Sequence, residues 1–434
     1  MSAPHTLEEL RSGRLTGIHR LKLACGLTSF PVEIFDLADS LEILDLSGNQ
    51  LSSLPDDLPR LHKLRILFCS DNLFTVLPPV LGACPELSMI GFKANQIHTV
   101  PAASLPPRLR WLTLTDNAIT ALPEEIGRCT QLQKLMLAGN QLTALPASLA
   151  TCTRLELVRI AANRLTVLPE WLLCLPRLSW LAYAGNPLAE AREVLALEQA
   201  DIPGIAWQRL QLGQQLGEGA SGVIYQAQLD AHDVAVKVFK GSMTSDGLPR
   251  SEMAACISAG QHDHLIPILG TVTSHPQGAM GLVMPLIDPA FRNLAGPPSL
   301  ESCTRDVYAD GLRFSLQQVL ALAHGIASAV RQLHAHGILH GDLYGHNILH
   351  ADEGACLLGD FGAASMFDPG SLQAEMLQGI EARAFGVLLA ELIAHGEECP
   401  PDLLALRDAC LLEEVWQRPR FAQIEKMLLL MQQA

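Results

Sequence analysis

Three side chains with oxygen donors mark the part of the chain where chemistry is expected. Asp342 and Asn347 stand five residues apart in "HGDLYGHN", residues 340–347, and Asp360 follows in "LLGDFGAAS". Carboxylate and amide oxygens are the ligands that a hard cation such as Mg²⁺ prefers. A further carboxylate beside such a cation can accept the proton of an attacking hydroxyl. The set therefore indicates a reaction on an anion that is held by a metal ion.

A lysine and three glycines upstream supply candidates for binding that anion. Lys237 lies inside the β-branched stretch "VAVKVF", where a lysine is costly unless it points toward an anion. Gly217, Gly219 and Gly222 form a GxGxxG pattern, which dinucleotide-binding folds share. Here the glycines lead into "VIYQAQL", an alternating strand, and not into a helix. This favours a glycine-rich hairpin laid over phosphates.

The order of these segments across residues 205–434 resembles that of protein kinases. The opening "IAWQRLQLGQQLGEGASGVIYQA" is most similar to the tyrosine-kinase-like branch of serine/threonine kinases. The resemblance implies a bilobal α+β domain that uses ATP and Mg²⁺. It also implies the roles of four catalytic residues: Asp342 as the base, Asn347 and Asp360 as magnesium ligands, and Lys237 as the partner of the α- and β-phosphates.

The same resemblance implies a nucleotide-binding set. Glu252 would pair with Lys237, Met284 would be the gatekeeper, and Pro285 to Ile287 would face the adenine. Because proline has no N–H, hinge hydrogen bonds would come from Leu286 and Ile287. The full predicted set is Leu216, Gly217, Gly219, Gly222, Ile224, Ala235, Lys237, Glu252, Met284, Leu286, Ile287 and Leu349.

The expected catalytic loop, residues 340–347, and the segment after Asp360 depart from the kinase pattern. Gly341 replaces an arginine that in many kinases receives the phosphorylated activation loop, and Tyr344 replaces the lysine of serine/threonine kinases. The stretch after the Asp-Phe-Gly motif is short. In "AEM", similar to a worn Ala-Pro-Glu motif, Glu375 is expected to pair with Arg418.

These departures leave three hypotheses open. The first is an active serine/threonine kinase of the non-RD type, which does not wait for activation-loop phosphorylation. Its repeats would direct it to a protein substrate, which could be the chain itself. The second is a pseudokinase scaffold whose repeats mediate protein interaction. The third is a kinase-fold phosphotransferase that acts on a small molecule.

The first half of the chain is an array of repeats. The pattern LxxLxLxxNxLxxLP begins at Leu41 and recurs at positions 64, 87, 109, 132, 155 and 178, with a degenerate copy at 18. It resembles leucine-rich repeats, in which no repeat can bury its leucine face alone. The sequence thus predicts a multidomain chain: an α/β solenoid over 1–188, a capping helix and linker over 189–204, and the kinase-like domain over 205–434.

One face of the predicted solenoid is a candidate binding surface. Strand residues that point away from the leucine core would line the concave side, and they include aromatic and cationic side chains of the kind found at protein interfaces. Isolated apolar residues on a surface are also ordinary. The candidates for contact with a protein partner are Phe68, Trp111, Met136, Arg159 and Trp180.

Composition excludes several classes of function and location. The net charge is −15, with most of the acidic excess in the second half, so nucleic acid or an anionic membrane is not an expected partner. The eleven cysteines lack metal-ligand or paired spacing, which is typical of reduced thiols. No signal peptide or membrane span is expected. We expect a cytoplasmic protein of bacterial style, and secretion without a cleaved signal stays open.

Overall fold

The computed structural model describes residues 4–199, 202–219, 221–241, 243–244 and 246–433. The chain forms two compact units. The first comprises Met1–Val158 and Asn163–Leu175, and the second comprises Arg159–Ala162 and Pro176–Ala434. Some residues of the last two repeats therefore belong with the C-terminal unit. The domain boundaries drawn from the motifs stay a prediction.

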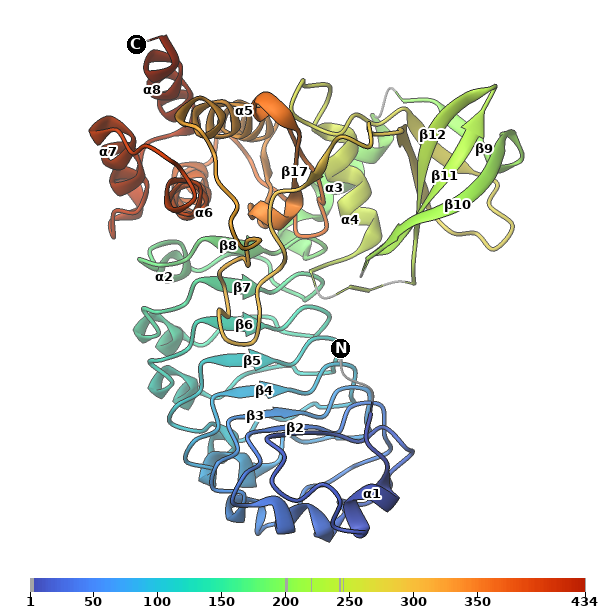
Figure 1. Ribbon diagram of the computed structural model, residues 1–434, viewed down its shortest axis with the longest axis vertical. Coiled ribbons are helices and arrows are strands. Elements are labelled where there is room, and N and C mark those ends of the chain that lie inside the picture. Colours follow the sequence, from blue (N-terminus) through green and yellow to red (C-terminus); the bar gives the residue numbers. More distant parts are fainter. Residues whose placement is uncertain (1–3, 200–201, 220, 242, 245, 434) are drawn as a thin grey trace. The chain divides into compact units, whose positions relative to one another are not determined.

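The first unit is built from one short strand per repeat. Its strands are β1 (Arg20–Lys22), β2 (Ile43–Asp45), β3 (Ile66–Phe68), β4 (Met89–Gly91), β5 (Trp111–Thr113) and β6 (Lys134–Met136), and β7 (Leu157–Arg159) begins in it. Strands β1 to β6 pair in parallel with each residue beside its equivalent in the next repeat. Figure 1 shows β2 to β6 following one another as rungs. The predicted parallel repeat array is confirmed.

The connections between these strands are short helices. They are the 3-10 helices η1 (Val32–Leu37), η2 (Leu58–Arg60), η3 (Pro79–Ala83), η4 (Ala102–Ser104), η5 (Glu124–Arg128) and η6 (Ala147–Thr151). Helix α1 (Leu7–Arg11) precedes β1, and α2 (Glu170–Leu173) follows β7. The leucine of each Leu-Pro pair is buried or nearly so at the entry to a connection, as at Leu145. The proline then restricts the backbone where the strand direction must reverse.

An asparagine that recurs in the copies from Leu41 onward ties neighbouring repeats together. The amide of Asn140 donates to the carbonyl oxygens of Leu114 and Leu137, both at 2.9 Å, and its Oδ1 accepts from the Ile119 amide at 3.0 Å. Buried backbone groups need such partners. One side chain therefore satisfies the turn of its own repeat and that of the repeat before it.

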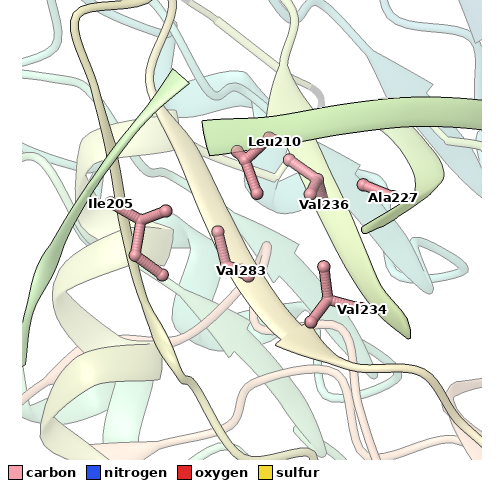
Figure 2. Close-up of a cluster of buried hydrophobic side chains, with 6 residues drawn as sticks. All are labelled: Ile205, Leu210, Ala227, Val234, Val236 and Val283. Atoms are coloured by element: carbon pink, nitrogen blue, oxygen red, sulfur yellow. The ribbon is translucent and has the colours of Figure 1, made fainter. Parts of the chain in front are cut away.

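The second unit contains a mostly antiparallel sheet in the order β10-β11-β12-β14-β13-β9. The strands are β9 (Gly204–Ala206), β10 (Leu210–Glu218), β11 (Gly222–Leu229), β12 (His232–Phe239), β13 (Gly270–Thr273) and β14 (Gly281–Pro285), and β9 pairs in parallel with β13. One face carries a buried aliphatic cluster of Ile205, Leu210, Ala227, Val234, Val236 and Val283 (Figure 2). The cluster fixes the strand register that aims Lys237 at the opposite face.

Helices and small sheets complete this unit. The helices are α3 (Pro187–Glu198), α4 (Pro249–Ser258), α5 (Leu316–Ala335), α6 (Ala374–Ala394), α7 (Pro401–Cys410) and α8 (Phe421–Gln433). Helix α5 packs against α8 (Figure 1). Short strands β15 (Arg292–Asn293), β17 (Ile348–His350) and β18 (Cys356–Leu358) form one sheet, and β16 (Ile338–Leu339) pairs with β19 (Ser365–Met366). The 3-10 helices are η7 (Trp207–Arg209), η8 (Gly345–Asn347), η9 (Asp352–Gly354) and η10 (Val415–Gln417).

The repeat residues of the second unit pack on the segment that follows Asp360. Strand β8 (Trp180–Ala182) is hydrogen-bonded to residues 159–162, with the Ile160 amide donating to the Ala182 carbonyl at 2.8 Å. The hydroxyl oxygen of Ser365 accepts from the amides of Tyr183 and Ala184 at 2.9 and 3.1 Å. The last repeat residues therefore make contacts with the segment after Asp360 that the sequence did not predict. Among the described helices, none is long and apolar enough to cross a membrane.

Candidate active site

A cavity of about 800 Å³ lies in the second unit. All twelve residues of the predicted nucleotide-binding set line it, and so does Asp360. The twelve come from β10, β11, β12, α4, β14 and β17 or from residues directly after β10 and β14, and they span more than 130 positions of sequence. The mixed lining, largely apolar with a few polar groups that converge, is typical of small-molecule sites.

The glycine-rich segment forms the turn between β10 and β11. Gly217 pairs with Ile224, and the Gly219 amide donates to the Gly222 carbonyl at 2.9 Å. A Cβ atom on Gly222 would lie 2.7 Å from the carbonyl oxygen of Val238, so this position has no room for a side chain. Cβ atoms on Gly217 or Gly219 would meet nothing within 4 Å. These two glycines therefore leave backbone accessible on the cavity side, as a hairpin over phosphates requires.

Lys237 and Glu252 form a buried ion pair at the back of the cavity. The Lys237 ammonium donates to Glu252 Oε1, and the two side chains are 13% and 3% exposed. Burial opposes the lysine charge, but Glu252 and Asp360 outweigh it and raise the pKa of Lys237. The lysine therefore stays cationic at neutral pH. Removing either partner would leave the other charge buried and uncompensated.

Strand β14, which leads into the predicted hinge, pairs with β12, the strand that carries Lys237. In the register of β12 and β14, Met284 pairs with Ala235 and Pro285 pairs with Val234. Leu286 and Ile287 follow directly and line the cavity. Because Pro285 lacks an N–H, the backbone N–H groups available at this rim come from the two residues after it.

The catalytic loop holds Asp342 and Asn347 together. The Asn347 amide donates to the Asp342 backbone carbonyl and to its Oδ2, both at 2.9 Å. Burial is the main cause that raises the pKa of Asp342, although Arg159 pulls it down. Within the described part of the chain, neither residue is among those that line the cavity. The structure thus brings Lys237, Glu252 and Asp360 to one cavity and places Asp342 and Asn347 outside its wall.

A buried glutamate holds the backbone of the catalytic loop. Glu381 on α6 accepts from the amides of His340 and Gly341 at 3.2 and 2.8 Å, and its Oε2 lies 2.7 Å from His334 Nε2. Burial alone raises the pKa of Glu381, but the hydrogen bonds from His334 and the backbone outweigh it and hold this pKa below its ordinary value. An ionised carboxylate therefore anchors the loop that carries Asp342.

A second anchor was not anticipated from the sequence. The carboxylate of Asp306 accepts from the His346 amide at 2.9 Å and lies 2.7 Å from His346 Nδ1. Its side chain is fully buried. These bonds hold η8, the turn that ends at Asn347. Asp306 lies forty residues from its partner in an irregular segment, so no local pattern could have identified it.

The expected pairing of Glu375 with Arg418 is wrong. Glu375 pairs with Arg420 at the surface. The guanidinium of Arg418 instead donates to the carbonyl oxygens of Leu412, Gly379, Pro176 and Glu413. The short segment after Asp360 leads directly into helix α6, which begins at Ala374. Backbone carbonyls therefore bind Arg418 in place of the expected carboxylate of Glu375.

Two candidates for partner contact are also placed differently from the prediction. Arg159 and Trp180 are each only 1% exposed, and both belong to the second unit. Arg159 contacts Asp342, and the Trp180 indole N–H donates to the Leu343 carbonyl at 3.0 Å. They are therefore not exposed anchors for a separate protein, because they cover the catalytic loop.

Comparison with known proteins agrees with this geometry. The model of the family "Protein tyrosine and serine/threonine kinase" matches residues 210–380. The chain contains a protein kinase domain. Models described as "Leucine rich repeat" match residues 107–165 and 40–61, so the chain also contains leucine-rich repeats. The predicted architecture, a repeat array followed by a kinase domain, is confirmed.

Several curated relatives are protein kinases of modest similarity. The serine/threonine-protein kinase mos of Gallus gallus is 29% identical over 185 residues, which are 39% of this chain and 51% of the relative. The megakaryocyte-associated tyrosine-protein kinase of Rattus norvegicus is 24% identical over 270 residues, 51% of this chain and 53% of the relative. The chain thus spans about half the length of these relatives. They give no support to a bacterial origin.

Proposed function

We propose that the chain is an ATP-dependent protein kinase that transfers the γ-phosphate of ATP, bound with Mg²⁺, to Ser or Thr hydroxyls of a protein, including its own. The observation that carries the proposal is the cavity in which the glycine hairpin, the Lys237–Glu252 pair, the hinge and Asp360 converge. This is the inventory that phosphoryl transfer needs, because the reaction depends on positioning and charge neutralisation.

The donor set fits a magnesium–nucleotide complex. Mg²⁺ is usually held by one or two protein oxygens together with phosphate oxygens. The described residues form no cluster of three or more His, Cys, Asp or Glu side chains that could hold a metal ion. Asp360 and Asn347 would hold the ion, which when bound neutralises charge on the phosphates.

The residues of the site have separate roles in this mechanism. Lys237, kept cationic and oriented by Glu252, binds the α- and β-phosphates, and the glycine hairpin lies over them. The backbone at Leu286 and Ile287 orients the adenine. Asp342 accepts the proton of the substrate hydroxyl, and its pKa, raised by burial, makes it a better acceptor than an exposed aspartate.

The repeats would bring the substrate or another protein to the domain. Phe68, Trp111 and Met136 remain candidates for this contact, and each is only partly buried in the first unit. Lys134 lies 4.1 Å from the centre of the Trp111 ring. A cation over an indole beside apolar side chains suits a partner with mixed acidic and apolar residues.

A pseudokinase scaffold is the second candidate, and one observation favours it. Both carboxylate oxygens of Asp342 are already engaged, Oδ1 by Arg159 and Oδ2 by Asn347. A domain that binds ATP without transferring phosphate would show the same cavity. The two functions differ in whether Asp342 changes the fate of bound ATP.

The experiment compares the full chain with its Asp342→Asn and Lys237→Met variants. Each is incubated with γ-labelled ATP and Mg²⁺, together with a peptide library containing Ser, Thr and Tyr, and phosphosites are mapped by mass spectrometry. We expect Asp342→Asn to lower incorporation about 10²–10⁴-fold while ATP still raises the melting temperature. ATP binding with no incorporation by the wild-type chain would favour the scaffold. Equal incorporation by wild type and Asp342→Asn would remove the assigned base.

A further inference from the structure

Arg159 is buried between two carboxylates in the second unit. Its Nε donates to Asp246 Oδ1 at 2.7 Å, its Nη1 donates to the Gly341 carbonyl at 3.0 Å, and its Nη2 donates to Asp342 Oδ1. The arginine side chain is 2% exposed. Surface ion pairs contribute little, but a desolvated guanidinium with three charge-assisted or backbone partners is held firmly. The contact is therefore a built feature of this unit.

The arginine occupies the side of Asp342 that a substrate needs. Oδ2 of Asp342 already accepts from the Asn347 amide, and we take Oδ1 as the oxygen that an incoming hydroxyl approaches. That oxygen accepts from Arg159. Asp246, the second carboxylate that Arg159 contacts, lines the cavity, whereas in the described residues Asp342 does not. The guanidinium thus bridges a carboxylate on the cavity wall and the carboxylate expected to act as base.

Trp180 covers the same loop from the neighbouring strand. Its ring stacks on that of Tyr344 at 4.2 Å between centres and 8° between planes. Tyr344 is 3% exposed and its hydroxyl is buried without a hydrogen-bond partner among the described residues. The guanidinium of Arg305 lies 5.5 Å from the centre of the Trp180 ring. Tyr344, which stands at the position of the expected lysine, is thereby packed away from the cavity.

We propose that Arg159 is a gating residue: it occupies Oδ1 of Asp342 in place of the substrate hydroxyl, and an external hydroxyl gains access only when Arg159 leaves. The proposal rests on the proposed kinase function. The gate closes the hydroxyl side alone, because the nucleotide side of the site, with Lys237, the glycine hairpin and the hinge, is open as a cavity. The resting chain therefore binds ATP and transfers phosphate slowly.

Arg159→Leu tests the gate, since it removes all three hydrogen bonds and leaves a shorter apolar side chain. Arg192→Leu is the matched control: Arg192 pairs with Asp368 at the surface, and the two side chains are 45% and 54% exposed. Incorporation of labelled phosphate into the Ser/Thr/Tyr peptide library is measured for both, with ATP and peptide varied separately. We expect Arg159→Leu to raise kcat/KM for peptide at least tenfold, to leave KM for ATP within twofold, and to lose the gain when combined with Asp342→Asn.

Two further measurements keep the test decisive. If Arg159→Leu does not fold, judged by its thermal melt, Asp246→Asn loosens the same arginine from the other side and should give a smaller gain in the same assay. A fall or no change in kcat/KM, with Asp342→Asn still abolishing the wild-type activity, overturns the gate and leaves the kinase function standing. Absence of incorporation in every variant, despite stabilisation by ATP, overturns both.

Discussion

Gly341 stands where many kinases have an arginine. Replacing it tests whether close packing against Leu181 of the last repeat excludes a side chain at this position. Gly341 has a φ of +73°, in the left-handed region. A Cβ atom there would lie 2.6 Å from the carbonyl oxygen of Ala363 and 2.7 Å from that of Leu181. Both contacts are with backbone, which cannot rotate aside. We therefore expect Gly341→Ala to destabilise the second unit and Gly341→Arg to do so at least as much.

The magnitude has two parts. An alanine at positive φ costs about 1–2 kcal/mol relative to a relaxed conformation. Forcing an atom into a packed site adds about 1–3 kcal/mol. Gly311 separates the two parts, because it has a φ of +75° and nothing within 4 Å of an added Cβ atom. Gly311→Ala should show the backbone cost alone, and Gly341→Ala should exceed it by about 1–3 kcal/mol.

Thermal melting of the full chain measures the difference. In a domain of this size each kcal/mol lowers the melting temperature by about 2–4 °C. Gly341→Ala should therefore melt several degrees below Gly311→Ala in the transition that ATP stabilises. Equal melting temperatures for the two variants would refute the reasoning, because the close approach of Leu181 and Ala363 would then have no energetic consequence.

The other predictions concern charged residues of the same unit, two of them buried and one exposed. Burial first, and then the nearby Asp306, raises the pKa of Glu391 to about 7 from 4.5. An acid that holds its proton more tightly when folded loses stability as the pH rises from about 4.5 to about 7, so Glu391→Gln should flatten that decline by up to about 3 kcal/mol in urea titrations across this range. Parallel curves would contradict this assignment. Glu375→Ala should change the free energy of unfolding by less than about 0.5 kcal/mol, since its pair with Arg420 is exposed. Arg418→Met should lower the free energy of unfolding by about 1–3 kcal/mol because buried carbonyls lose their donor. Equal losses for Glu375→Ala and Arg418→Met would contradict this assignment of partners.

The sequence by itself determined the repeat array and the nucleotide side of the site. A side chain that must pack in a stack, such as Asn140 or the strand leucines, recurs at a fixed period because each repeat meets the same neighbours. The glycines, Lys237 and the hinge also follow from local pattern, since strand alternation decides which face each residue occupies. All twelve predicted nucleotide-binding residues accordingly line one cavity.

Only the tertiary structure decided what surrounds Asp342. Arg159 lies 183 positions before this residue, and its repeat pattern predicted a concave-face side chain like any other. The pairing of Arg418 likewise could not be read from motif spacing, because its partners are backbone carbonyls that carry no sequence signal. Periodicity reports which way a side chain points from its own element. What it meets there depends on which distant element the fold brings close.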